Sequence, residues 1–342
     1  HGPIVSEVGN TWVTSLAKMN ALRAFNEQEI EAIGGPEAFI PATWRHDAES
    51  DEPIWSIPWL AESRVILYRR DLLEEVGIAE ETAFDTLEHL ESTLMRLQDS
   101  GICNPLILPT NKTANTLHNL PSWIWGEGGD FVDSKHRRVT FTTPSARTGI
   151  QEYFGLYRFL APELYGLDPY QAEAKFITGE AAVTFNGPWT VFLLDEQPQP
   201  NYLDKIGVAL LPGISCVLAS DLVVWKHTPV RQERIAVELV QFLTGREAQL
   251  HCPQQTGLLP ARFETLSLEP FSIDPRYQVF VNALKSGRSL PVMRLWGLIE
   301  ERLTVAFANL WDQILQDPDP DLDAIIQAEL NPLAQKLNRI LQ

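Results

Sequence analysis

Apolar residues recur every three to four positions in several stretches of the chain, the spacing that places them on one face of a helix. These stretches cover residues 12–22, 84–97, 150–160, 231–243 and 298–315. Shorter apolar runs lie between them and predict strands. The runs cover residues 65–68, 106–108, 183–185, 207–211 and 222–225. Because strands alternate with helices, the pattern predicts an α/β fold with parallel-rich sheets flanked by helices and with ligand sites at the carboxyl ends of strands.

Trp189 stands at an unusual place in this pattern. A predicted helix ends near Gly179, a short apolar strand follows, and the turn Asn186-Gly187-Pro188 then leads directly into the tryptophan. A core tryptophan is normally held by regular structure on both sides, whereas side chains that follow such a turn tend to face a cleft. The pattern therefore favours a ligand contact for Trp189, with core packing as the alternative.

Length and composition are those of a globular chain with two lobes of ordinary size. The chain has 342 residues, of which 44% are hydrophobic and 21% charged. No apolar run approaches the ~18 residues that span a membrane. The formal charge of -18 argues against nucleic acid and anionic membranes as partners, because both require clustered Lys and Arg. A neutral or cationic ligand fits this charge.

Tryptophan and cysteine content narrow the chemistry further. The ten Trp residues are many for this length, and aromatic faces bind sugars, bases and quaternary amines. Cys103, Cys216 and Cys252 lie far apart, with no CxxC and no His at metal-ligand spacing. The sequence therefore predicts no metal site, no thiol redox centre and no other cofactor.

Several segments, in order along the chain, resemble one known family. They are GNTWVTSLA (9–17), IPWLAESRVILYRRDLLEEVGI (57–78), FITGEAAVTFNGPW (176–189), LTGREAQLHCPQQTGLLPAR (243–262) and LWGLIEERLTVAFANLWDQIL (295–315). Together they are similar to the extracellular solute-binding proteins of ABC importers, in the maltose-binding-like group that carries sugars. The resemblance covers essentially the whole chain.

The resemblance implies a two-lobed, type II periplasmic-binding-protein-like fold with the ligand cleft between hinged lobes. It predicts crossings near residues 108–110, 215–220 and 287–291. The N-terminal lobe would then comprise 1–108 plus about 220–287, and the C-terminal lobe 109–219 plus about 288–342. The implied function is capture of a carbohydrate and its delivery to the membrane permease of an ABC importer. The expected protein is a monomer and extracytoplasmic, either periplasmic or membrane-anchored at the cell surface.

One departure from the family concerns the start of the N-terminal lobe. Members usually have a strand, a helix and a second strand before the segment that resembles residues 9–17, and this sequence does not contain that first βαβ unit. The expectation is a sheet with a poorly covered edge, which favours self-association or partial disorder.

The resemblance also nominates ligand contacts in the segments assigned to the C-terminal lobe. Trp189 corresponds to a stacking platform for a sugar ring, and Trp296 is a second stacking candidate before a predicted helix. In the segment 118–132, His118 and Trp123 are the better ligand candidates. A satisfied structural histidine is the alternative for His118, and Trp125 and Phe131 are expected to pack.

In the N-terminal lobe the candidates are carboxylates, an arginine and two indoles. Glu62 aligns with an acidic ligand contact of the family, and Arg64 follows two residues later; their alternative is a surface ion pair. Trp12 and Trp59 are expected to flank the ligand, with a structural role as the alternative for each. Asp221 is the weaker candidate, because the family often has two glycines where this chain has Ala219-Ser220.

Two other classes of function stay open at this point. A glycoside-active enzyme also combines tryptophan platforms with a pair of carboxylates, but Glu7, Glu62, Glu127 and Asp221 lie in separate segments and no pair stands out. The prediction is therefore a protein without catalytic residues. A binding protein for polyamines, peptides or other non-sugar solutes is the remaining alternative, since cations would suit the charge of -18.

Overall fold

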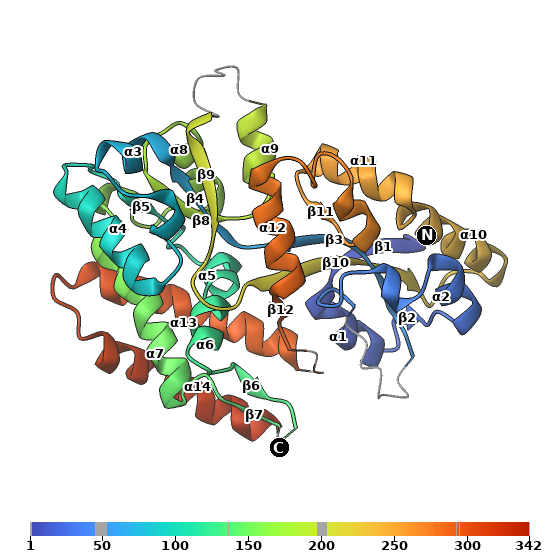
Figure 1. The fold of residues 1–342 in the computed structure, drawn as a ribbon. Helices are drawn as coiled ribbons and strands as arrows, with labels where there is room; N and C mark the ends of the chain where they lie inside the picture. The colour runs from blue at the N-terminus through green and yellow to red at the C-terminus, as the bar shows by residue number, and fades with distance from the viewer. Residues whose placement is uncertain are drawn as a thin grey trace. The chain divides into compact units, whose positions relative to one another are not determined.

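The computed structural model of this chain describes residues 2–44, 53–135, 137–196, 204–291, 293 and 295–341. It divides into two compact units, each assembled from separate stretches of sequence. Unit 1 comprises residues 1–63, 187–192 and 217–297, and unit 2 comprises 64–186, 193–216 and 298–342. Both contain helices packed on a sheet, so the predicted α/β fold with two discontinuous lobes is confirmed (Figure 1).

The sheet of unit 1 is built around the long strand β10 (Cys216–Trp225). Its order is β1 (Val5–Gly9), β10, β3 (Ser56–Ser63) and β11 (Leu259–Pro260), and the short strands β2 (Leu22–Arg23) and β12 (Arg288–Ser289) also pair with β10. Both β1 and β3 run antiparallel to β10, and β11 runs antiparallel to β3. The strands β1 and β3 are thus parallel to each other but separated by β10.

Helices cover this sheet on both faces (Figure 1). They are η1 (Asn10–Trp12), α1 (Val13–Lys18), α2 (Glu27–Ile33), η2 (Pro36–Ala38), α10 (Val230–Leu243), α11 (Arg246–Thr256), η7 (Phe263–Ser267) and α12 (Pro275–Ser286). On one face, Ala236, Val237 and Val240 of α10 pack in a cluster with Leu222 and Val224 of β10. On the other face, a smaller cluster joins the start of α1 to β2 and β10.

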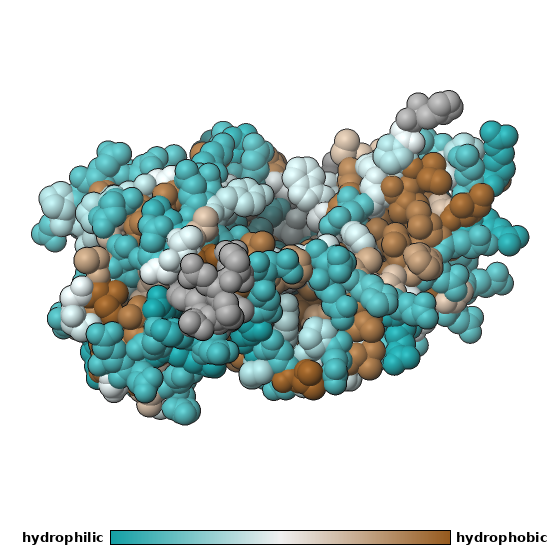
Figure 2. All heavy atoms as spheres, turned by 90° about the horizontal axis from the view of Figure 1, so that it is seen from above, coloured by the Kyte–Doolittle hydropathy of each residue, from teal (hydrophilic) through white to brown (hydrophobic). Residues whose placement is uncertain are grey.

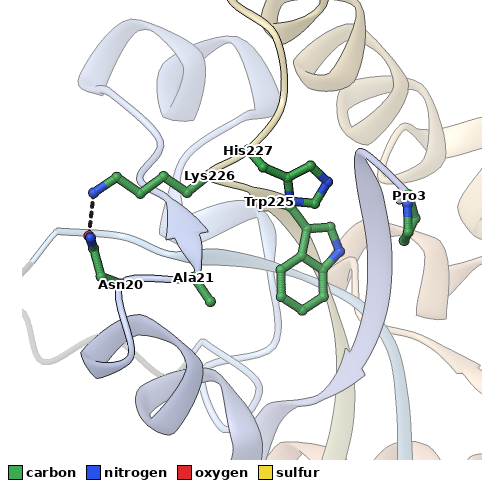
Figure 3. Close-up of a pocket in the computed structure, with 6 residues that line it drawn as sticks. All are labelled: Pro3, Asn20, Ala21, Trp225, Lys226 and His227. Carbon is green, nitrogen blue, oxygen red and sulfur yellow. Dashed lines mark hydrogen bonds between the residues drawn. The ribbon is translucent and has the colours of Figure 1, made fainter. Parts of the chain in front are cut away.

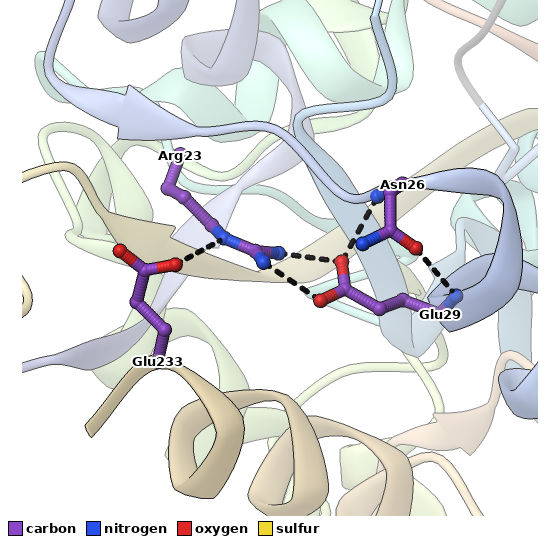
Figure 4. Close-up of polar contacts among 4 residues, drawn as sticks. All are labelled: Arg23, Asn26, Glu29 and Glu233. Carbon is purple, nitrogen blue, oxygen red and sulfur yellow. Dashed lines mark hydrogen bonds and ion pairs between the residues drawn. The ribbon is translucent and has the colours of Figure 1, made fainter. Parts of the chain in front are cut away.

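A partly buried ion-pair network joins α2, β2 and α10 (Figure 4). The Arg23 guanidinium donates to both carboxylate oxygens of Glu29, at 2.5 and 2.7 Å, and its Nε lies 3.4 Å from Glu233 of α10. Asn26 caps α2, and its backbone N–H donates to Glu29. Burial raises the pKa of Glu29, but the hydrogen bonds from Arg23 and Asn26 outweigh it, so the pKa lies below its usual range.

The main sheet of unit 2 has the order β5 (Leu106–Ile107), β8 (Val183–Asn186), β4 (Val65–Arg69) and β9 (Ile206–Leu210). Only β5 and β8 are parallel, because β4 runs antiparallel to both of its neighbours. A small antiparallel pair, β6 (Val132–Asp133) and β7 (Arg138–Val139), lies apart from it. The prediction of parallel-rich sheets is therefore wrong for both units. In unit 1, β10 lies between the parallel strands β1 and β3, and in unit 2, β4 lies between the parallel strands β8 and β9.

The helices of unit 2 surround an aromatic core. They are α3 (Arg70–Glu75), η3 (Glu80–Thr82), α4 (Leu87–Asp99), α5 (Ala114–Asn119), α6 (Pro121–Gly126), α7 (Pro144–Gly155), η4 (Leu156–Phe159), η5 (Pro162–Leu164), α8 (Pro169–Ile177) and α14 (Leu322–Leu341), with most of α13 (Trp296–Gln316) and the end of α9 (Trp189–Asp195). Tyr153 and Phe154 of α7 contact Trp311 of α13, with ring centroids 5.8 and 4.6 Å apart. None of the helices described is both long and apolar enough to cross a bilayer.

The boundary between the units differs from the expected one at its first crossing. Residues 64–108, assigned by sequence to the N-terminal lobe, belong to unit 2, because β4 pairs with β8 and β9. The chain passes from unit 1 to unit 2 between Ser63 and Arg64, rather than near residues 108–110. The changes at 216/217 and 297/298 lie within and a few residues beyond the predicted crossings. Two further changes, at 186/187 and 192/193, were not predicted. As a result Trp189 and Trp296, both assigned by sequence to the C-terminal lobe, belong to unit 1.

Candidate functional site

The nine predicted contact residues are distributed over both units, and each group is described within its own unit. Unit 1 holds Trp12, Trp59, Glu62, Trp189, Asp221 and Trp296. Unit 2 holds Arg64, His118 and Trp123.

A line of polar side chains crosses the interior of unit 2. Arg64 is only 4% exposed, and its Nη2 lies 3.4 Å from Nδ1 of His118 on α5. On the other side of the imidazole, Nε2 lies 3.8 Å from Oε1 of Glu300 on α13. Three elements that are far apart in sequence thus bring a guanidinium, an imidazole and a carboxylate into one row.

The two ring nitrogens of His118 face groups of opposite character. Arginine can only donate, so Nδ1 is the nitrogen placed to accept from Arg64. Nε2 faces the carboxylate of Glu300. The separation of 3.8 Å is too long for a hydrogen bond, so Glu300 retains acceptor capacity on this side.

Several buried polar atoms near this row have no hydrogen-bond partner among the residues that the structure describes. They are Oδ1 of Asn119, Oγ of Ser122, Nε1 of Trp123 and Oε2 of Glu300. Three of these residues, Asn119, Ser122 and Trp123, come from the nearly continuous turns of α5 and α6, where Ser122 follows His118 by one helical turn. A buried donor or acceptor without a partner lowers stability by about 1 to 3 kcal/mol. A hydroxyl-rich ligand or ordered water would satisfy these atoms.

The aromatic core explains why these groups are held in place. The Trp123 ring centroid lies 5.0 Å from that of Tyr153 and 5.4 Å from that of Phe185, and only 3% of the residue is exposed. The indole therefore offers its Nε1 edge rather than a face. The Asn119 amide donates to the Tyr153 hydroxyl at 3.3 Å, and burial raises the pKa of Tyr153 to about 12. Tyr153 is thus neutral at physiological pH.

Trp125 and Phe131, which were expected to pack, are buried as predicted. The Trp125 indole donates to Asp130 at 3.2 Å, which closes the turn after α6.

Trp189 begins α9 and is partly exposed in unit 1. One side of its indole lies on the backbone of Gly187, where a Cβ would come within 2.0 Å of the ring. Its own backbone lies against Gly257, which closes α11 with a φ of +71° and where a Cβ would meet the Trp189 Cα at 2.6 Å. Two positions without side chains therefore hold this tryptophan, and part of it stays accessible.

The strands of unit 1 place its carboxylates differently from one another. Asp221 is 1% exposed and accepts a hydrogen bond from the Ser56 hydroxyl at 2.5 Å, whereas Glu62 is only partly buried. Where β10 pairs with β3, Ser220 lies opposite Leu60 and Asp221 lies opposite Pro58. Trp59 is therefore an extra residue of β3 and forms a bulge. Such a bulge redirects its side chain. The Trp59 indole is partly exposed, packs on the α10 cluster, and has a buried Nε1 without a partner among the described residues.

The two remaining tryptophans of unit 1 lie at opposite extremes of exposure. Trp12 ends η1 and is 56% exposed, so its indole is available to a ligand. Trp296 begins α13 and is fully buried, which leaves no free aromatic face in this structure. The geometry thus favours a structural role for Trp296 and for the face of Trp123. The proposal of direct stacking is kept for Trp189 and Trp12.

Two surface pockets lie away from all nine residues. One, of about 630 Å³, lies in unit 1 at the end of β10 (Figure 3). It is lined by Pro3, Asn20, Ala21, Trp225, Lys226 and His227. The other, of about 470 Å³, lies beside α3 in unit 2 and is lined mainly by charged groups already joined in the ion pairs Arg70–Glu80 and Lys205–Asp71. Neither contains the partly buried row of Arg64, His118 and Glu300.

Sequence reasoning did not identify Asn119, Ser122 or Glu300 as candidates. Ser122 carried a weak signal, since it lies one turn beyond His118 on a predicted helix. Glu300 carried none, because it sits in an amphipathic helix where acidic residues are ordinarily solvated. Only the packing of α13 beside α5 brings its carboxylate to His118.

Comparisons with known proteins assign the chain to one group. The family model described as "Bacterial extracellular solute-binding protein" matches residues 3–250. A probable ABC transporter-binding protein of Deinococcus radiodurans is 25% identical over 265 residues, which are 72% of this chain and 62% of that relative. The chain therefore spans less than two thirds of that relative's length.

Solved structures share the fold over the whole chain. The sugar-binding protein MalE of Xanthomonas citri superposes with a TM-score of 0.82 at 21% identity, covering 99% of this chain and 84% of that one. UgpB of Mycobacterium tuberculosis, solved with glycerophosphocholine, superposes with a TM-score of 0.81 at 15% identity, covering 100% and 85%. Identities this low establish the architecture, and one fold accommodates different ligands.

Proposed function

Because the chain belongs to the bacterial extracellular solute-binding protein family, we propose that it is the substrate-binding component of an ABC importer for a neutral carbohydrate. It captures a mono- or oligosaccharide by closure of its two hinged lobes and delivers it to the membrane permease. Its working place is outside the cytoplasm, in a periplasm or anchored at the cell surface. The chain carries out no chemical step on the sugar.

The observation that carries this proposal is the row of Arg64, His118 and Glu300 with its neighbouring unsatisfied groups in unit 2. Sugar hydroxyls both donate and accept, and this set offers a donor at Trp123 together with acceptors at Glu300 and Asn119. The guanidinium and the carboxylate balance each other in charge, which suits a neutral ligand better than an ion. Trp189, partly exposed at the start of α9, supplies the aromatic face that a pyranose ring requires.

A cationic solute is the second candidate, and the buried carboxylate of Asp221 favours it. Glu62 adds a second partly buried carboxylate on β3, and the chain as a whole carries -18 charges. A polyamine or choline-type group would gain from these charges and from the tryptophans. The Arg64 guanidinium opposes such a ligand, so the carbohydrate is the preferred assignment.

A thermal-shift screen followed by calorimetric titration tests the assignment. Mono- and disaccharides, a polyamine and glycerophosphocholine are compared at equal concentration, and a ligand at ~100 times its Kd should add about 2.7 kcal/mol to stability. We expect the shift with a sugar and none with the polyamine. The reverse result would assign a cationic solute.

The enzymatic alternative requires a separate measurement. An oligosaccharide that stabilises the protein is incubated with it for hours, and the products are separated by chromatography. A binding protein returns the ligand unchanged, whereas the appearance of shorter sugars would contradict the proposal.

A further inference from the structure

The helix α11 and the strand β11 contain none of the nine predicted contact residues, yet both pack on β3, which carries two of them. The buried face of α11 contains Ala248, Gln249 and Pro253, and polar residues occupy its exposed positions. The neighbouring helix α10 differs, because it also exposes apolar residues, and Figure 2 shows apolar surface at its right, over the part of unit 1 that contains α10. Gln249 is the polar member of the buried face of α11, and a buried amide requires hydrogen-bond partners.

The side chain of Gln249 is fully buried and forms a hydrogen bond at each end of its amide. Its Nε2 donates to the Trp59 carbonyl at 2.6 Å, and its Oε1 accepts from the backbone N–H of Arg262 at 3.0 Å. The Ala261 N–H lies farther from the same carbonyl, at 3.4 Å. Because Trp59 is the extra residue of a bulge, its place in the strand ladder is irregular, and the short bond from Gln249 fixes the backbone that carries the indole.

Gly257, at the end of α11, lies against the start of α9. A Cβ added at Gly257 would come within 2.6 Å of the Trp189 Cα and within 2.7 Å of the Phe192 Cβ. Since the first of these atoms belongs to the backbone, a side chain at position 257 would displace the start of α9 together with the Trp189 indole. The absence of a side chain at Gly257 thus determines where Trp189 lies.

One short stretch of chain contacts both tryptophans. Gly257 lies against Trp189, and Ala261, four positions later, lies near the Trp59 carbonyl. Between these two residues, β11 pairs with β3. Four residues extend over at most about 14 Å, so the backbones of Trp59 and Trp189 are both anchored to the same short connection.

We propose that the segment 249–261 is the positioning element for the aromatic ligand contacts of unit 1, with Gln249 acting through Trp59 and Gly257 acting through Trp189. This inference rests on the proposed carbohydrate-binding function. Neither positioning residue touches the sugar itself. Their role is to fix the two indoles before the sugar arrives, which reduces the loss of side-chain freedom on binding and favours the stacked geometry.

Double-mutant cycles test the proposal, with the dissociation constant measured by calorimetric titration of the sugar that gives the largest thermal shift among mono- and disaccharides such as maltose. Gly257→Ala should raise this constant at least about fivefold in the wild-type background and less than about twofold in the Trp189→Ala background. Gln249→Met should behave in the same way with Trp59→Ala, because methionine keeps the length of the side chain but cannot donate to the Trp59 carbonyl. A merely structural role would raise the constant by the same factor in both backgrounds. Urea unfolding of each variant separates lost stability from lost affinity.

Gly166→Ala is the matched control for backbone strain. Gly166 has a φ of +73°, close to the +71° of Gly257, but no described atom beyond its chain neighbours lies within 4 Å of an added Cβ. The control therefore places alanine in the same left-handed region without the contact, and it should leave the dissociation constant unchanged.

Additive losses in both cycles overturn the inference and leave the proposed function in place. An effect of Gly166→Ala as large as that of Gly257→Ala does the same for Gly257. If Gly257→Ala does not yield folded protein, the cycle of Gln249 and Trp59 decides alone. A wild-type chain that binds none of the sugars overturns the proposed function and the inference with it.

Discussion

Unit 1 and unit 2 hold candidate ligand contacts of different chemistry. In unit 1 the candidates are indoles and carboxylates distributed over η1, β3, α9, β10 and the start of α13, with exposures from 56% for Trp12 to 0% for Trp296. In unit 2 they form one partly buried row supported by an aromatic core. The indoles of unit 1 are therefore suited to contact a ligand over a broad apolar surface. The polar row of unit 2 is suited to recognise hydroxyl groups through directional hydrogen bonds. A division of this kind separates affinity from specificity, and mutations in the two units should have distinguishable effects.

The largest expected effect tests whether the unit 2 row depends on its aromatic support. Trp123→Ala removes a fully packed indole and should cost about 3 to 5 kcal/mol of unfolding free energy. Trp12→Ala, at an exposed indole of unit 1, should cost less than about 0.5 kcal/mol. Urea unfolding followed by circular dichroism measures both. Similar values for the two variants would mean that the aromatic cluster does not support unit 2.

Trp123→Phe sharpens this test, because it preserves most of the packing and deletes only the Nε1 donor. Stability should then be largely retained, and sugar affinity should fall by about 1 kcal/mol, the worth of one hydrogen bond. Unchanged affinity would remove Trp123 from the list of ligand contacts.

Trp189→Ala is the corresponding change in unit 1. If the indole stacks on a sugar ring, affinity should fall by about 2 kcal/mol, roughly thirtyfold, while the melting temperature changes little. Fluorescence titration and a melting curve of the same variant check the two quantities. A melting point many degrees lower, with affinity unchanged in the folded fraction, would identify Trp189 as a structural residue held by Gly187 and Gly257.

Glu300→Gln tests the polar row with a smaller change. The substitution keeps the shape but removes the negative charge beside His118, and the loss of a charged acceptor should cost about 1.5 kcal/mol in binding, near tenfold. Glu301→Gln, at the exposed neighbouring position on α13, is the control and should have no effect. Calorimetry at constant pH compares them. Equal affinities for both variants would place Glu300 outside the site.

Much of this fold could be predicted because the spacing of apolar residues along the chain indicates which face of each helix or strand is packed. The helices at 231–243 and 298–315 agree with α10 and α13 to within two residues at each end. The sequence pattern predicted β10 only from Leu222 onward, because the polar residues Ser220 and Asp221 interrupt the apolar run. In the structure both residues pair with β1 on one side and with β3 on the other. The crossing at Arg64 was missed because β3 ends at Ser63 and β4 begins at Val65, so the crossing lies inside a nearly continuous strand-like stretch with no glycine or proline next to it.

The candidate site was less predictable, because its contacts join distant segments. Glu300 meets His118 across more than 180 positions of sequence, and nothing near Glu300 marks it as different from the solvated acids of the same helix. The bulge at Trp59 likewise depends on how β3 pairs with β10. Residue types at a turn, as at Trp189, are the kind of local signal that sequence does carry.

The smallest expected effect is on how the unfolding free energy depends on pH, and the pH range in which stability is lost should differ between the two units. In unit 2, burial, followed by repulsion from Glu127 and Glu91, raises the pKa of Glu152 to about 7. The native state then holds its proton more tightly than the unfolded state, so this contribution is full below pH ~4.5 and is lost as pH rises through about 7. In unit 1, burial raises the pKa of Asp274, but hydrogen bonds from Arg276 outweigh it and lower the pKa below its usual value. The stability that Asp274 contributes is therefore lost as pH falls through that lowered pKa.

Because Glu152 is partly solvated, its share of the unfolding free energy should be less than about 1 kcal/mol. Urea unfolding from pH 4.5 to 8 should show a shallow decline in wild type that Glu152→Gln removes. Parallel pH profiles for the two proteins would mean that Glu152 titrates normally.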